Sequence, residues 1–192
     1  MKRIFILFIA IAIVQISIPL YLIAKREYIL KTGTPYLFLT RPVDPIDIFR
    51  GRYLHIKYDF EDDLIKSLKE KYSSQPYSHK IVYLCLTQSK DKVGTIKEIS
   101  EVPPQGSNYI KLKIVVSKNY TNYSLNFNQF YMDEFKATQA ESIYQAQSQK
   151  KEAYALVYVK NGDVVLADLL IDNIPIRQYL KHFSTNSKQT IK

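Results

Sequence analysis

The chain has 192 residues, of which 46% are hydrophobic and 23% are charged. This length predicts one main domain, and this composition is that of a folded protein, which excludes disorder as its dominant state. The net charge of +9 could suggest nucleic-acid binding, but +4 of it lies in residues 1–31 and +4 in residues 177–192, so the middle of the chain carries only +1. Charge at the two ends suits a membrane surface or a solvated tail better than a nucleic-acid groove, so no nucleic-acid partner is expected.

The N-terminal segment from Ile4 to Ala24 contains 21 residues without a charge. A helix of that length is about 31 Å long, enough to cross a hydrocarbon core of about 30 Å. The alternative is a cleaved signal peptide, because Lys2 and Arg3 would form its basic start. The apolar run is, however, longer than a typical signal core of roughly 7–15 residues and has no small-x-small cleavage site. We therefore expect residues 1–31 to form a membrane anchor.

The rest of the chain alternates short apolar runs with turn signals, and its 16 tyrosines and 9 phenylalanines favour β-structure. The anchor helix is expected to continue to Thr32 and end at Gly33. The later elements, in chain order, are predicted as strand 35–41, loop 42–50, strand 52–60, helix 62–72, strands 81–87, 93–102 and 109–116, a hairpin arm over 120–130, helix 133–150, strands 153–160 and 163–171, and a helical turn over 177–183.

Two of these elements have particularly clear patterns. Along Arg52 to Phe60, polar and apolar residues alternate, so Leu54, Ile56 and Tyr58 should share the buried face. Strands 153–160 and 163–171 are separated by Asn161-Gly162, which accepts the two positive φ angles of a type I′ turn and predicts a β-hairpin. Because a lone hairpin is marginally stable in water, we expect it to share a sheet system with the 51–60 segment.

These elements predict an α+β fold, mostly antiparallel β, in a barrel- or sandwich-like domain with two short helices, preceded by one N-terminal transmembrane helix. The domain is expected to occupy residues 32–183, and residues 184–192 are expected to form a loose basic tail.

The segment 42–52 is the candidate interaction loop. Its prolines fix φ and its aspartates can accept backbone N–H groups, so the loop should be stiff. An arginine–carboxylate pair could lock it further, and the glycine allows a sharp turn into the next strand. It can be interpreted either as a self-locked structural corner or as a rigid loop that recognises a partner or polar ligand. The residues concerned are Pro42, Asp44, Pro45, Asp47, Arg50, Gly51 and Arg52, followed on the strand by Tyr53 and Tyr58.

The sequence contains few residues in patterns typical of a catalytic site. The three histidines, His55, His79 and His182, have no metal-type spacing, so no metal site and no cofactor is expected. Asp44 with Asp47 could form at best a weak acid–base or cation site. The single Cys85 is expected to be a buried inert thiol, with an intermolecular bridge as the alternative. We expect no enzymatic activity and name no catalytic residue.

Two blocks of the sequence resemble the GDYXXLXY family, which is named for the pattern Gly-x-Tyr-x-x-Leu-x-Tyr. The pattern reads here Gly51, Tyr53, Ile56 and Tyr58, with Arg52 in place of the family's Asp and Ile56 in place of its Leu. The first block runs from residue 31 to 58, and the second lies in the hairpin and its continuation to residue 175. The resemblance implies a membrane-anchored bacterial protein with an exported C-terminal domain and a polytopic membrane protein as its partner. It implies no established activity.

The charges beside the apolar segment and the family resemblance together predict how the protein is oriented in the membrane and what role it has. Basic pairs flank the apolar segment on both sides, so the positive-inside count is not decisive. A short basic N-terminal tail usually stays inside, and together with the resemblance this predicts a single-pass protein of the inner (cytoplasmic) membrane, N-in, with its domain outside the cytoplasm. We expect a non-catalytic component of a membrane protein assembly. The alternative is an envelope ligand sensor or hydrolase that uses the 42–52 loop.

Overall fold

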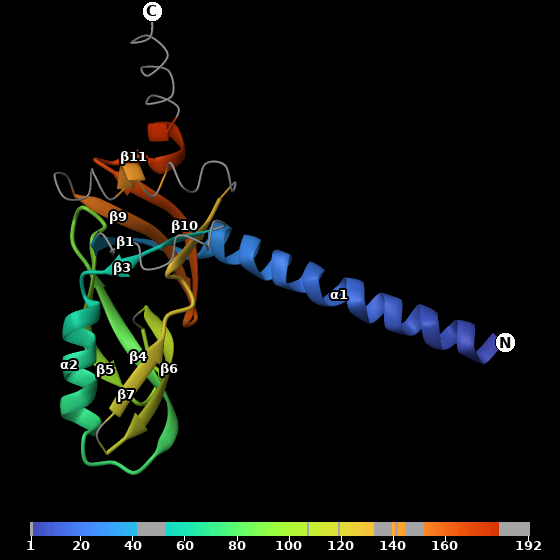
Figure 1. Cartoon of the computed structure of the whole chain (residues 1–192), viewed down its shortest axis with the longest axis horizontal. Helices are drawn as coiled ribbons and strands as arrows, with labels where there is room; N and C mark the ends of the chain where they lie inside the picture. Colours follow the sequence, from blue (N-terminus) through green and yellow to red (C-terminus); the bar gives the residue numbers. More distant parts are fainter. Residues whose placement is uncertain are drawn as a thin grey trace, which may run out of the picture.

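The computed structural model describes residues 2–41, 53–106, 108–118, 120–132, 140, 142–144 and 152–180. Helix α1, Lys2–Thr32, runs without a break through Pro19 and projects away from the rest of the molecule (Figure 1). It ends as predicted at Gly33, whose backbone N donates to the Ile29 carbonyl at 2.8 Å. Within the described residues, α1 is the one helix long and apolar enough to span a membrane.

A five-stranded sheet begins directly after α1. Its strand order is β11-β10-β9-β1-β3, and every neighbouring pair is antiparallel. The helix leads through the single residue Gly33 into β1, an interior strand of this sheet that lies between β9 and β3. The bounds are Thr34–Arg41 for β1, Lys57–Tyr58 for β3, Ala153–Lys160 for β9, Asp163–Ile171 for β10 and Ile174–Pro175 for β11.

Two further antiparallel sheets complete the domain. A four-stranded sheet has the order β5-β4-β6-β7, and a two-stranded sheet pairs β2 with β8. The part of the chain that the structure describes does not close into a barrel. The bounds are Tyr53–His55 for β2, Ser78–Gln88 for β4, Gly94–Ser100 for β5, Tyr109–Ser117 for β6, Tyr120–Ser124 for β7 and Gln129–Tyr131 for β8.

Helix α2, Glu61–Tyr72, confirms the predicted amphipathic helix. Acidic residues occupy its first turn and lysines its last turn, the order that the helix dipole favours. Its buried face consists of Leu64, Leu68 and Tyr72, and these side chains join a single hydrophobic core with residues of all three sheets. In Figure 1, α2 lies on the side of the domain away from α1.

The predicted strand 52–60 is divided in the structure. Its alternation is confirmed, since Leu54, Ile56 and Tyr58 are buried, but β2 pairs with β8 whereas β3 pairs with β1. The change occurs at Ile56, whose N donates to the Asn128 carbonyl at 2.9 Å. The segment therefore pairs with a different strand on each side of Ile56.

The predicted arm over 120–130 is likewise two separate strands, β7 and β8, in different sheets. Of the predicted helix 133–150, residues 140 and 142–144 are helical and the remainder lies outside the described residues. The predicted turn at 177–183 is helical over 176–180, and residues 181–192, including the expected tail, also lie outside them.

The hairpin is confirmed, with φ angles of 51° at Asn161 and 85° at Gly162. It shares the five-stranded sheet with β3, as expected. Its turn also reaches the four-stranded sheet, where the backbone N of Lys111 on β6 donates to the Gly162 carbonyl at 3.0 Å. The closeness of this approach leaves no space for a side chain at Gly162, because an added Cβ would lie 2.7 Å from the Tyr109 ring.

We predict that Gly162→Ala destabilises the domain much more than Gly106→Ala. Both glycines have positive φ, 85° and 76°, so both variants incur a backbone cost of about 1–2 kcal/mol. Only Gly162→Ala adds a steric clash, because no heavy atom lies within 4 Å of a Cβ at Gly106. Overpacking costs about 1–3 kcal/mol, and that is the expected difference in unfolding free energy, measured by urea denaturation of the full-length protein in detergent. Equal losses in the two variants would show that the turn is not packed on β6.

Candidate functional site

The candidate interaction loop lies between β1 and β2. Tyr53 and Tyr58 are described, as is Arg41 at the other end of the loop, whereas Pro42, Asp44, Pro45, Asp47, Arg50, Gly51 and Arg52 lie outside the described residues. The structure therefore defines the base of the loop, and the predicted contacts within it stay predictions.

Tyr58 is a core residue with 0% exposure. Its hydroxyl donates to the Phe127 carbonyl at 2.6 Å, and its ring lies against Phe38, Phe60 and Phe127 at centroid distances of 5.1–6.0 Å. Burial raises the pKa of the phenol well above its usual value. This buried position is the one that the alternation along 52–60 predicts for Tyr58, which belongs to the family motif and holds the base of the candidate interaction loop from inside.

Tyr53 has a different environment. It is half-buried on β2, opposite Tyr131 of β8, and the two rings lie 5.6 Å apart. Tyr131 is 59% exposed. This tyrosine pair lies where the loop rejoins the sheet and leaves aromatic surface accessible to a neighbouring molecule.

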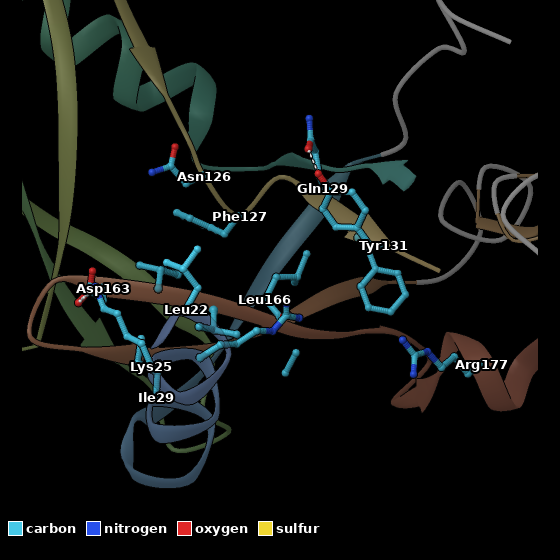
Figure 2. A pocket seen from close by; sticks show the side chains of 15 residues that line it. Leu22, Lys25, Ile29, Asn126, Phe127, Gln129, Tyr131, Asp163, Leu166 and Arg177 are labelled. Carbon is cyan, nitrogen blue, oxygen red and sulfur yellow. Dashed lines mark hydrogen bonds and ion pairs between the residues drawn. The ribbon is translucent and has the colours of Figure 1, made fainter. Parts of the chain in front are cut away.

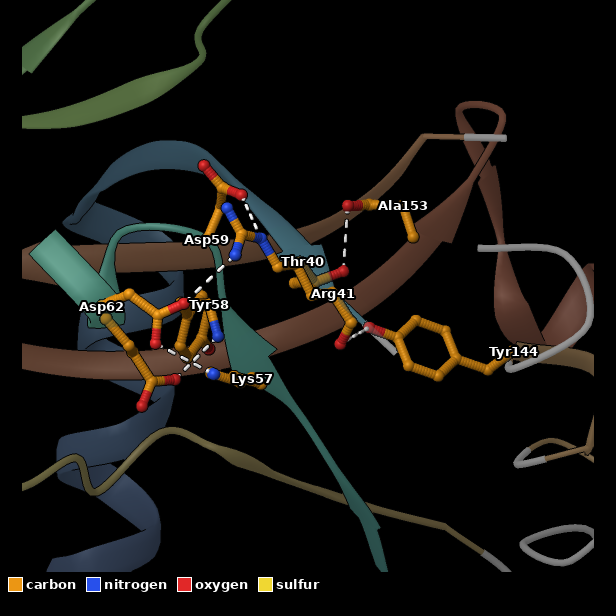
Figure 3. A network of polar contacts seen from close by, with 9 residues as sticks. Thr40, Arg41, Lys57, Tyr58, Asp59, Asp62, Tyr144 and Ala153 are labelled. Atoms are coloured by element: carbon orange, nitrogen blue, oxygen red, sulfur yellow. Dashed lines mark hydrogen bonds and ion pairs between the residues drawn. The ribbon is translucent and has the colours of Figure 1, made fainter. Parts of the chain in front are cut away.

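A charged network surrounds the other end of the loop (Figure 3). Arg41 pairs through Nε with Asp59 and through an Nη with Asp62 at 3.1 Å, and Lys57 binds the second oxygen of Asp62 at 2.9 Å. The hydrogen bond from Lys57 is the main cause that lowers the pKa of Asp62 below its usual value, and Arg41 adds to it. These side chains are about half exposed, so each pair contributes little to stability. The network instead links the end of β1 to β3 and to the first turn of α2.

The backbone beneath this network is held by buried polar groups. The hydroxyl of Thr40 donates to the Ala153 carbonyl at 2.9 Å, and that of Tyr144 donates to the Arg41 carbonyl at 3.2 Å. Burial raises the pKa of Tyr144 to about 12. Since both hydroxyls are buried and neutral at physiological pH, these anchors do not depend on ordinary pH changes.

Glu61, the first residue of α2, links the motif to the four-stranded sheet. One carboxylate oxygen accepts from the backbone N of Tyr58 at 2.7 Å and the other from the hydroxyl of Tyr123 at 3.0 Å. The sequence analysis missed this residue and the Arg41 network, because the partners of each are brought together by pairing between separate strands. The sequence signal that could have indicated them is the group of charged residues on the two sides of the loop, Arg41 before it and residues 57–62 after it.

A groove of about 550 Å³ lies beside this network, between α2 and the edge strand β5. Leu39, Phe60 and Ile96 form part of its apolar lining, and Asp63 and Lys71 are among its charged residues. The groove is continuous with the base of the loop, because Asp59 and Phe60 belong to both.

Groups suited to catalysis do not converge here. Among the described residues, no cluster of three or more His, Cys, Asp or Glu side chains could hold a metal ion. His55 lies on β2 and His79 on β4, in different sheets, and His182 lies outside the described residues. Cys85 is buried at 3% exposure, and burial raises the pKa of its thiol, which matches the expected inert thiol.

The contacts between α1 and the hairpin were also not predicted from the sequence. Lys25 on α1 pairs with Asp163 on β10 at 2.9 Å, and the Lys160 ammonium lies 4.4 Å from the centre of the Tyr28 ring. Ile29 is buried between them at 5% exposure. The partners are more than 100 residues apart in sequence, so no local pattern could reveal them.

Fold and site together define a class: an α+β domain of antiparallel sheets joined without a linker to a single long apolar helix, with its charged and aromatic clusters at the base of one inter-strand loop. The family described as GDYXXLXY protein matches residues 15–169, so the chain belongs to the GDYXXLXY family. No curated protein and no solved structure matches the chain in the same comparisons.

We predict that Tyr58→Phe lowers the unfolding free energy by about 1–3 kcal/mol, because it leaves the buried Phe127 carbonyl without its hydroxyl donor. Tyr120→Phe is the matched control, since Tyr120 is 58% exposed and surface changes usually stay within about 0.5 kcal/mol. Urea denaturation of both variants in detergent measures the difference. A Tyr58→Phe protein as stable as the control would mean that the hydroxyl does not anchor the motif.

Proposed function

We propose that this protein is a single-pass protein of the inner membrane, with its N-terminus in the cytoplasm and its β-rich domain outside it. There it serves as a non-catalytic component of a membrane protein assembly, with a polytopic membrane protein as its partner. The observation that carries the proposal is the packed junction between α1 and the domain, with one residue between the helix and the first strand.

The exposed apolar surface of α1 supports the membrane part of the proposal. Its large apolar residues from Ile4 to Ile23 are 41–73% exposed, a surface that water would not stabilise but hydrocarbon would. A single helix forms no pore, so its lipid-facing sides remain available for lateral contacts with other helices.

The junction supports the assembly part. Ile29 contributes most of its stability, since burying such a side chain is worth about 1.5–3 kcal/mol. The Lys25–Asp163 pair and the Lys160–Tyr28 contact are largely exposed, so each adds little to stability. Gly33 is the only residue between α1 and β1, so this short connection leaves the domain little freedom to reorient relative to the helix. A domain that must meet a neighbour in the membrane benefits from a fixed orientation, whereas one that binds a diffusing ligand does not need it.

The proposal is tested by cross-linking followed by affinity purification. Spheroplasts carrying the tagged full-length protein are treated with a membrane-impermeant amine cross-linker, which reaches the domain lysines only if the domain is outside the cytoplasm. We expect a cross-linked species that contains this protein and a polytopic membrane protein. A variant with a flexible Gly-Ser insert after Gly33 should remain in the membrane but lose most of this product, because its domain is no longer oriented.

Each part of the proposal can fail separately. Cross-linking only with a permeant reagent would contradict the orientation. Recovery of the protein alone, together with a turnover activity that Asp44→Ala abolishes, would replace the assembly role by the sensor or hydrolase alternative. An insert variant that cross-links as well as the parent would show that the rigid junction is not used.

A further inference from the structure

A second cavity, of about 300 Å³, lies where α1 meets β10 and β8. Figure 2 shows the Lys25–Asp163 pair at one end of it and Arg177 at the other, with Leu166 and Tyr131 between them. Its volume is at the lower end of the roughly 300–1,000 Å³ of small-ligand sites. The lining of the cavity includes Leu22, Lys25, Arg26, Gln129, Asp163 and Arg177.

The charges of this cavity are unbalanced. Three cationic side chains face one carboxylate in its lining, and that carboxylate, Asp163, is already paired with Lys25. Arg26 donates a long hydrogen bond of 3.4 Å to the Leu166 carbonyl, and Arg177 lies 5.5 Å from the centre of the Phe130 ring. No carboxylate of the described residues forms an ion pair with either guanidinium; Asp168 interacts with Arg177 only through longer-range electrostatics. Two arginines with most of their donors unused form a site for an anion that accepts several hydrogen bonds.

The position of the cavity along α1 indicates where that anion comes from. Leu22 is at the end of the uncharged segment, and Arg26 follows the last uncharged residue, Ala24, by two positions, or about 3 Å of helix. The headgroup region on each side of a bilayer is roughly 5–8 Å thick. If α1 spans the membrane, the cavity therefore lies in the headgroup layer.

We propose that this cavity binds the phosphate group of an anionic phospholipid, with Arg26 and Arg177 as the phosphate ligands and Gln129 as an additional donor. The inference rests on the proposed function in one respect, the insertion of α1 into a membrane. The acyl chains of the lipid would lie along α1 beyond Leu22, where Ile18 and Leu22 are 57% and 58% exposed. A soluble phosphate ester would meet the same arginines but would leave this apolar surface unused, which is why the lipid is the favoured occupant.

The test measures which lipid the full-length protein retains. The protein is reconstituted into phosphatidylcholine vesicles that contain phosphatidylglycerol as a minor component, and the lipids that remain bound after mild detergent extraction are identified by native mass spectrometry. We expect wild-type protein to be enriched in phosphatidylglycerol, and expect this enrichment to fall about fivefold with either Arg26→Gln or Arg177→Gln, and further in the double variant. High salt should reduce it as well.

The control removes two charges from the far side of the domain. Lys66→Gln with Lys69→Gln changes exposed residues of α2, and its phosphatidylglycerol enrichment should equal that of the wild type. Inserted wild-type protein that shows no preference for phosphatidylglycerol overturns the inference, as does an enrichment that soluble glycerophosphate abolishes by competition. An equal loss in the control would show a general charge effect and overturn it too. Protein that fails to co-float with the vesicles contradicts the membrane anchor itself, which separates failure of the proposed function from failure of the lipid site.

Discussion

The turn of the β9–β10 hairpin, which belongs to the five-stranded sheet, contacts both α1 and the four-stranded sheet. Lys160 and Asp163, at the two ends of the turn, contact Tyr28 and Lys25 of α1, while Gly162 between them accepts a hydrogen bond from β6. The turn can make both contacts only because Asn161 and Gly162 adopt positive φ and because Gly162 has no side chain to collide with Tyr109. These four consecutive residues therefore contact both α1 and the four-stranded sheet, and they act together with the buried Ile29 at the junction.

A second constraint on the fold is that the motif segment forms two short strands, which pair with different sheets. β1 pairs with β9 along seven residues but with β3 along only two, and the motif segment divides its backbone between β3 and β2. Such short pairings are weak alone, and the core compensates for this: Tyr58 joins aromatic residues from β1 and from the segment after β7 into one cluster. Of the family-pattern residues, Ile56 and Tyr58 lie on the face of this segment that fills the core, whereas Tyr53 lies on the opposite face against Tyr131.

Local features were predictable from the sequence. The anchor helix with its end at Gly33, the amphipathic helix α2 and the Asn161-Gly162 hairpin each depend on residues that are adjacent in the chain. The division of the 52–60 strand was not predictable, because it depends on which distant strands offer backbone partners at Thr40 and Asn128. For the same reason the Arg41 network and the Lys25–Asp163 pair could not be predicted from the sequence. The burial of Tyr58 was predictable from the alternation along 52–60, but the buried carbonyl that its hydroxyl reaches, that of Phe127, was not, because the two residues are far apart in sequence.

The central claim is that α1 and the domain form one rigid unit, and a distance distribution between them tests it most directly. Spin labels are placed at Ile16 of α1 and Lys66 of α2, both exposed, in a Cys85→Ala background, and the distance is measured by pulsed electron resonance in lipid bilayers. We expect one narrow peak for the parent and a broad distribution when a flexible Gly-Ser segment follows Gly33. A parent distribution as broad as that of the insert variant would contradict the account.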